Sequence, residues 1–185
     1  MIKSVIRIGA LAAMVSAGAS VAYAKDPMVG GAAMYASKNI IENAVNSKDH
    51  TTLVAAVKAA GLVDTLEGKG PFTVFAPTNE AFKKLPAGTV ETLLKPENKA
   101  TLTKILTCHV VAGDDMAAAI KKMSMSNGGE YDLKTVGGCV IKAMEKGGKL
   151  TLVDEAGGTA HVTIADVKQS NGVIHVVDRV LLPKM

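Results

Sequence analysis

One short segment, residues 70–82 (GPFTVFAPTNEAF), constrains the fold more than any other part of the chain. It contains all three phenylalanines and changes abruptly from strand-like to helix-like patterning. Both alternating faces of residues 72–76 are largely apolar, which predicts a strand that is covered on both sides. Pro77 ends this strand, and Thr78 is placed to cap a helix that contains Phe82. The segment therefore predicts a buried strand that turns directly into a helix.

The first 24 residues have the features of an export signal. Lys3 and Arg7 form a basic start, residues 8–21 are apolar, and Ala22-Tyr23-Ala24 presents the small-x-small pattern of a signal-peptidase site. The apolar run is shorter than the roughly 20 residues that a spanning helix needs. We therefore expect residues 1–24 to be cleaved, which gives a periplasmic or extracellular protein with no membrane span. The alternative is a retained membrane anchor.

Charge and composition narrow the class of partner. The formal charge is +4 for the whole chain and falls to +2 without Lys3 and Arg7. Lysines are spread along the chain, with neither arginine clusters nor interleaved aromatic residues, so a nucleic-acid groove is not supported. We find no internal repeat, and the length suits one domain.

Helical patterning dominates the first half of the mature chain, and strand patterning dominates the second half. Residues 25–38 contain Asp-Pro and Gly-Gly and are expected to form a flexible leader, followed by a single domain over residues 39–185. Helices are predicted at 39–45, 49–60, 78–85, 88–94, 96–106 and 114–123, with Asp49 and Asp114 as caps. Strands are predicted at 107–111, 131–136, 139–144, 149–154, 161–165 and 173–182, with glycine turns between several of them. This order favours an α+β fold with an antiparallel meander.

Catalytic and metal-binding constellations are scarce in this sequence. Cys108 and His109 are neighbours, but neighbouring side chains on a strand point to opposite faces and cannot form a catalytic pair. The spacing of His109, His161 and His175 matches no zinc signature. We expect His109 and His175 to be partly buried and held by backbone hydrogen bonds. The sequence therefore predicts no enzyme, no cofactor and no metal site, and a hydrolase or metalloenzyme is the least favoured function.

Two cysteines in an exported chain suggest a disulfide bond. A bond between Cys108 and Cys139 would stabilise the fold by roughly 3–4 kcal/mol, because it closes a loop of the unfolded chain. Two buried free thiols are the alternative.

Three segments resemble the hallmark motifs of the fasciclin (FAS1) domain family. Residues 70–82 resemble the first hallmark, residues 106–113 (LTCHVVAG) the central motif and residues 171–183 (NGVIHVVDRVLLP) the second hallmark. The resemblance implies an antiparallel β-sandwich wedge with several helices packed on one side. It also implies that the hallmark residues mainly build the core: Phe72, Phe75, Pro77, Thr78, Asn79, Phe82, Asn171, Gly172, His175 and Asp178.

The resemblance also suggests three candidate interaction residues, Asp166, Val167 and His109. Asp166-Val167 stands where animal members have an Asp-Ile pair implicated in integrin-type recognition; a structural role in a loop is the alternative. His109 belongs to a Tyr-His pair linked to adhesion and packing, but Cys108 replaces the tyrosine here. We hypothesise that a Cys108–Cys139 bond offsets the lost aromatic volume.

These observations favour an exported, non-enzymatic adhesion or protein-interaction module. Its expected partner is a cell-surface or extracellular-matrix protein or glycan, and we expect a monomer. The alternative is a small-ligand carrier with an apolar pocket between helices and sheet, which would need a volume of about 300 Å³ or more.

Overall fold

The computed structural model describes residues 26–184, so the expected signal sequence, residues 1–24, lies outside the described residues. The α-helices are α1 (Ile40–Ala44), α2 (Thr51–Ala60), α3 (Val63–Glu67), α4 (Asn79–Lys83), α5 (Thr89–Leu93), α6 (Lys99–Thr107) and α7 (Ala117–Ser126), with 3₁₀ turns at η1 (Lys48–His50) and η2 (Pro96–Asn98). The strands are β1 (Met28–Val29), β2 (Ala32–Ala33), β3 (Phe72–Pro77), β4 (Val110–Ala112), β5 (Tyr131–Lys134), β6 (Val140–Lys146), β7 (Lys149–Val153), β8 (Thr159–Gln169) and β9 (Gly172–Val177).

A seven-stranded sheet of order β4-β3-β9-β8-β7-β6-β5 forms the centre of the molecule. Strands β5 to β9 form the expected antiparallel meander, and β4 also pairs antiparallel with β3. Strands β3 and β9 run parallel, with Phe72 opposite Gly172 and Pro77 opposite Val177. The predicted α+β class with helices packed on one side is confirmed, and the sheet is mixed because the two hallmark strands are parallel.

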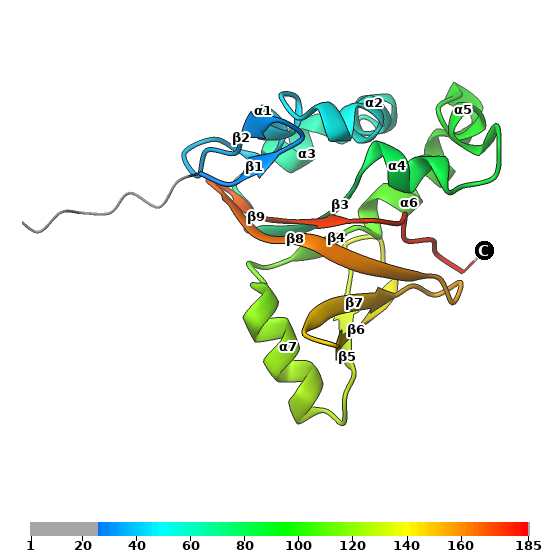
Figure 1. Cartoon of the computed structure of the whole chain (residues 1–185). Coiled ribbons are helices and arrows are strands. Elements are labelled where there is room, and N and C mark those ends of the chain that lie inside the picture. The colour runs from blue at the N-terminus through cyan, green and yellow to red at the C-terminus, as the bar shows by residue number, and fades with distance from the viewer. Residues whose placement is uncertain (1–25, 185) are drawn as a thin grey trace, which may run out of the picture.

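Strands β3 and β9 lie between two apolar cores, as Figure 1 shows by the helices above them and the β5–β8 strands with α7 below. Val74 and Ile174 belong to the upper core, which they share with buried residues of the helical layer such as Phe82. Phe75 and Val177 belong to the lower core, which contains Ile120 of α7. The prediction that this strand is covered on both sides is confirmed.

The turn after β3 joins three elements through two polar side chains. The Thr78 hydroxyl accepts a hydrogen bond from the Ala81 backbone N–H at 3.2 Å, which confirms it as the cap of α4. Asn79 Oδ1 accepts from the Thr52 N–H at 3.0 Å, and Asn79 Nδ2 donates to the Lys48 carbonyl at 2.8 Å. The prediction that Asp49 caps α2 is wrong, because the side chain at the start of this helix comes from Asn79.

Asn171 and Gly172 form the second joint between helices and sheet. The buried Asn171 side chain accepts from the Ile40 N–H at 3.0 Å and donates to the carbonyls of Leu66 at 2.7 Å and Gly68 at 2.9 Å. It thereby fixes the start of α1 and the end of α3 to the turn before β9. Without the Asn171 amide, the Ile40 N–H and the two carbonyls would each lose this hydrogen-bond partner.

Residues 26–38 are not a flexible leader. Met28–Val29 pairs with Ala32–Ala33 as a hairpin, and Val29 and Met34 are buried in the upper core. The Asn43 amide then bonds to both the N–H and the carbonyl of Tyr35. The Gly-Gly of this segment forms a turn whose flanking apolar residues are needed to complete the core.

Two element boundaries around the central motif also differ from the prediction. Helix α6 continues to Thr107, so Cys108 and His109 follow a helix and the strand begins only at Val110. Asp114 does not cap the next helix, which begins at Ala117. The main chain therefore passes from α6 to β4 through Cys108 and His109.

Candidate functional site

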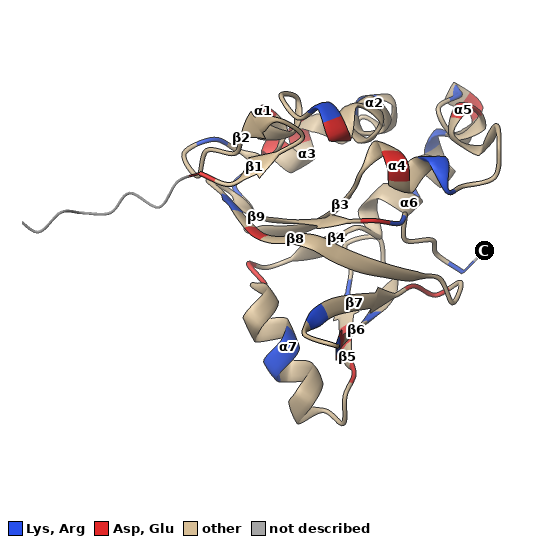
Figure 2. Cartoon of the chain, viewed as in Figure 1, with Lys and Arg blue, Asp and Glu red and all other residues tan. Residues whose placement is uncertain are grey.

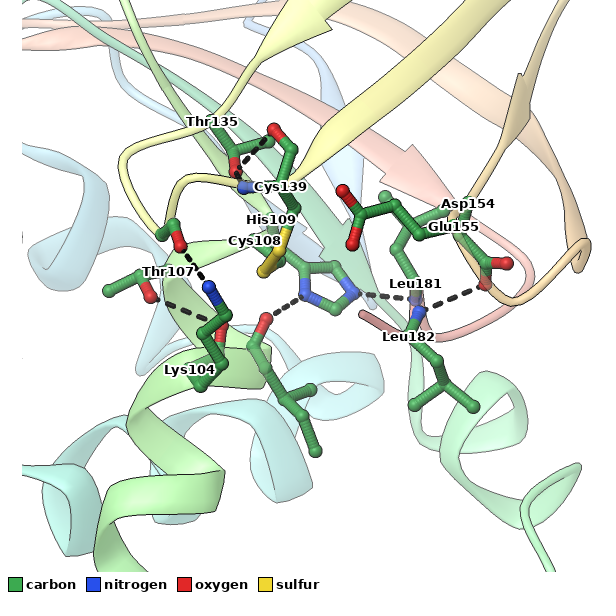
Figure 3. The surroundings of a disulfide bond; sticks show 12 residues. Lys104, Thr107, Cys108, His109, Thr135, Cys139, Asp154, Glu155, Leu181 and Leu182 are labelled. Atoms are coloured by element: carbon green, nitrogen blue, oxygen red, sulfur yellow. Dashed lines mark hydrogen bonds between the residues drawn. A yellow bond between two sulfur atoms is a disulfide. The ribbon is translucent and has the colours of Figure 1, made fainter. Parts of the chain in front are cut away.

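His109 and the cystine tie α6 to the C-terminal segment. Cys108 and Cys139 are bonded, with their Cα atoms 5.4 Å apart, so the predicted disulfide is confirmed. Figure 3 shows His109 beside this bond: its Nδ1 lies 2.8 Å from the Ile105 carbonyl, and its Nε2 accepts from the Leu181 N–H at 2.9 Å. Burial lowers the pKa of His109 to about 4. Both ring nitrogens are engaged by the main chain, so His109 is available neither as a base nor to a partner.

Reduction of the disulfide is expected to lower the free energy of unfolding by about 3 kcal/mol. The bond joins the end of α6 to the start of β6 across 31 residues, and both cysteines are buried. The measurement is urea denaturation with and without reductant. The double variant Cys108→Ser/Cys139→Ser should be destabilised to a similar extent and should not respond to reductant. A response in the double variant would show that the reductant acts elsewhere.

His175, the second buried histidine of the motifs, lies within the hallmark strand β9. It is fully buried and stacks on Phe75, with 5.6 Å between ring centroids. Its Nδ1 accepts from the Asp166 N–H at 3.1 Å, and its Nε2 lies 2.9 Å from the Asp115 carbonyl. Burial lowers the pKa of His175, although three nearby aspartates partly oppose this effect. His175 therefore fastens β9 to a bulge of β8 and to the loop before α7.

Asp166 lies in that bulge and has a structural function. Its φ angle of 59° is in the left-handed region, and the pairing of β8 with β9 is irregular at this point. Its carboxylate accepts a hydrogen bond from the Ala117 N–H at 2.7 Å, at the first residue of α7. Val167, which follows it, is fully buried. Burial removes Val167 and His109 from the candidate interaction residues, and Asp166 is only partly accessible.

Replacement of Asp166 by alanine is expected to cost about 1–2 kcal/mol of stability, since both the cap of α7 and the tolerance of a left-handed φ are lost. Asp166→Asn keeps the accepting oxygen and the tolerance of this backbone conformation, so it should cost less than about 0.5 kcal/mol. Thermal or urea denaturation of both variants measures the difference. Asp166→Asn also removes the charge, so a loss of partner binding in this variant at unchanged stability would indicate direct recognition by Asp166.

The remaining hallmark residue, Asp178, also serves the fold. Its Oδ1 accepts from the His161 N–H at 2.7 Å, and its Oδ2 lies 3.6 Å from Lys84 Nζ. These contacts link the end of β9 to β8 and to the helical layer. The sequence resemblance correctly indicated that the hallmark segments build the interior.

Two small apolar cavities lie between helices and sheet, each of about 30 Å³. One is lined by residues such as Val29, Met34 and Ile174, and the other by residues such as Ile41, Val57 and Leu106. Ligand pockets usually measure about 300–1,000 Å³, so neither cavity can hold a small organic molecule without rearrangement. The predicted pocket of a carrier is therefore not formed here, because the apolar side chains of the upper core fill this space.

Open hollows lie on the solvent side of strands β5–β8, which we call the outer sheet face. Cross-strand pairs such as Asp132–Lys142 and Thr151–His161 lie on this face, opposite the lower core. Three open hollows of about 400, 400 and 480 Å³ are found there. Sequence patterning gave no indication of them, since they depend on the register of four strands and on the length of exposed side chains.

Within residues 26–184, no group of three or more His, Cys, Asp or Glu side chains is arranged to hold a metal ion. No helix in the same range has the length and hydropathy required to cross a bilayer.

Comparison with known proteins agrees with this architecture. A family model described as the fasciclin domain matches residues 48–183. The Synechocystis protein sll1483 is 48% identical over 161 residues, which cover 87% of this chain and 82% of that protein. The cell surface glycolipoprotein MPB83 of Mycobacterium bovis is 33% identical over 191 residues, which cover 93% of this chain and 79% of that protein.

A solved structure shares the fold. The FAS1 domain pair of the insect cell adhesion molecule fasciclin I is similar with a TM-score of 0.70 and 21% sequence identity, over 78% of this chain and 51% of that chain. The family match, the close relatives and the shared fold lead to one conclusion. This chain belongs to the fasciclin domain family.

Proposed function

We propose that this protein is an exported adhesion or interaction module that binds a surface or matrix partner without chemical turnover. The observation that carries the proposal is the use of the hallmark side chains: His109, His175, Asn171 and Asp178 all make internal hydrogen bonds. A rigid scaffold of this kind leaves recognition to its exposed surface. Membership of the fasciclin family supports the same function, since fasciclin proteins are generally non-enzymatic adhesion modules.

Three further observations support export. Residues 1–24 have the pattern of a secretory signal. The Cys108–Cys139 bond is typical of proteins in oxidising compartments. The Mycobacterium bovis relative is named a cell surface protein, and the insect structural neighbour is named a cell adhesion molecule.

Two measurements test the proposal. Fractionation of cells that express the full chain with a C-terminal tag should place it outside the cytoplasm, with the disulfide formed. Protein purified from that fraction should bind intact envelopes of the source cells in a saturable manner, while a heat-denatured sample should not. A cytoplasmic location, or binding that does not saturate, would contradict the proposal.

A further inference from the structure

The β6–β7 turn on the outer sheet face brings two lysines together beside a hollow. Lys146 and Lys149 lie directly opposite each other in the strand pairing, on either side of Gly147-Gly148. The adjoining hollow has a volume of about 400 Å³, and its lining includes both lysines together with Thr151, His161, Thr163 and Asp178. We call it the lysine hollow.

Within the part of the chain that the structure describes, ammonium groups outnumber carboxylates at this turn. Two like charges opposite each other destabilise a strand pair, and neither lysine forms an ion pair within residues 26–184. From the other side of the sheet, Lys121 of α7 donates to the Gly148 carbonyl at 2.6 Å, which adds a third ammonium group to the turn. In Figure 2, blue ribbon marks Lys or Arg both on α7 and at the end of β7 nearest to it. An anion placed here would relieve the repulsion.

The neighbouring carboxylates are already engaged by other groups. Glu145 Oε1 accepts from the Gly148 N–H at 2.5 Å, which stabilises the turn itself. Both oxygens of Asp178 contact other groups of the protein, the His161 N–H and the Lys84 ammonium. These contacts leave the carboxylates charged, so the positive character of the lysine hollow comes from two lysines against one lining carboxylate, Asp178.

The other side chains of the hollow indicate the chemistry of the anion. Thr151 is almost fully buried at its floor, with its hydroxyl 3.3 Å from His161 Nδ1, and Thr163 is exposed. Hydroxyl and imidazole groups can bond to carboxylate or sulfate oxygens and to sugar hydroxyls. The lining has no phenylalanine, tyrosine or tryptophan on which a nucleic-acid base could stack. This combination favours a glycan over a nucleic acid.

We infer that the lysine hollow binds an acidic polysaccharide through its carboxylate or sulfate groups. The inference rests on the proposed function, because it names the chemical class of the partner. The volume of the lysine hollow, about 400 Å³, is within the range of small-ligand sites. One short stretch of the polymer would therefore occupy it.

The test compares two double variants that lose the same charge. Lys146→Gln/Lys149→Gln alters the hollow, whereas Lys58→Gln/Lys95→Gln alters two exposed lysines of the helical layer. Binding to polygalacturonate, dextran sulfate and neutral dextran is measured by fluorescence anisotropy at low and high salt. Melting temperatures of all variants confirm that they remain folded.

We expect the unaltered protein to bind one or both acidic polymers, more weakly at high salt, and not to bind neutral dextran. The hollow variant should bind about tenfold more weakly, because it loses two exposed charge pairs with the polymer, and the control variant should change less than about twofold. Binding of only one polymer would identify carboxylate or sulfate as the recognised group. Thr163→Val should also weaken binding, since it removes an exposed hydroxyl of the lining and no charge.

Two results would overturn the inference: no binding to either acidic polymer, or equal losses in the two double variants. Envelope binding distinguishes this failure from failure of the proposed function. If the hollow variant still binds envelopes as the unaltered protein does, only the polysaccharide inference fails. If the unaltered protein binds no envelope fraction, the proposed function fails as well.

Discussion

Replacement of Gly172 by alanine is expected to lower the free energy of unfolding by about 4 kcal/mol or more, close to the loss of the native fold. Gly172 begins β9 and pairs with Phe72 in the parallel pair β3–β9. A Cβ atom at this position would lie 1.9 Å from the Phe72 carbonyl oxygen and 2.7 Å from its nitrogen. These are backbone atoms of a strand covered on both sides, so they cannot move aside without disturbing both cores.

Gly88→Ala is the matched control for this prediction. Gly88 precedes α5 with a φ angle of 80°, and a Cβ there would meet nothing within 4 Å. Its replacement should cost only the strain of a left-handed backbone, about 1–2 kcal/mol. Urea denaturation monitored by circular dichroism measures both variants. Equal losses in the two variants would show that the contact with Phe72 does not determine the stability of Gly172.

The sequence predicted those elements whose determinants are close together in the chain. The strand at Phe72–Pro77 follows from its apolar residues on both faces, and the helix after it follows from Thr78 three residues before the N–H that it caps. The glycine pairs likewise gave the turns between β5 and β8. In each case the residues that decide the local structure are neighbours in sequence.

Structure that depends on distant partners could not be predicted in this way. Asn79 caps α2 from 27 residues away, and Asp166 supports α7 from 49 residues away. Neither helix begins with a capping residue of its own. The prediction that the nearby Asp49 and Asp114 cap these helices is therefore wrong. The hollows of the outer sheet face could not be predicted either, because they depend on the register of the strands.

Acidification is expected to destabilise the protein between pH 6.5 and about 4, mainly through buried histidines. His109 and His175 each accept a backbone N–H with one ring nitrogen and face a carbonyl with the other. This arrangement fits a neutral ring with one N–H, donated to the carbonyl. A second proton would place two N–H groups against each other in the interior. Each ring is therefore held neutral by its burial and by the backbone N–H that it accepts, although the bond to the carbonyl acts in the opposite direction.

The direction of the effect follows from the lowered pKa values. Burial lowers the pKa of His109 from 6.5 to about 4, and it also lowers the pKa of His50 and His175. The unfolded chain consequently binds protons first as the pH falls. The full stabilisation is present above pH 6.5 and is lost as the pH falls toward the folded-state pKa values. His109 alone accounts for about 3 kcal/mol over this range, with a slope of about 1.4 kcal/mol per pH unit.

Urea denaturation at pH 7.5, 6.5, 5.5 and 5.0 measures this dependence before most carboxylates titrate. Asp115 has the opposite effect, because burial and Asp114 raise its pKa, so its protonation favours the folded state as the pH falls. The decisive variant is His109→Gln, whose amide can both donate and accept but carries no titrating group. It should be less stable at pH 7.5 and should show a slope reduced by about 1.4 kcal/mol per pH unit. An unchanged slope would mean that His109 takes up a proton equally well in the folded and unfolded chains, and would contradict the expected effect of its burial and of the Leu181 N–H that faces Nε2.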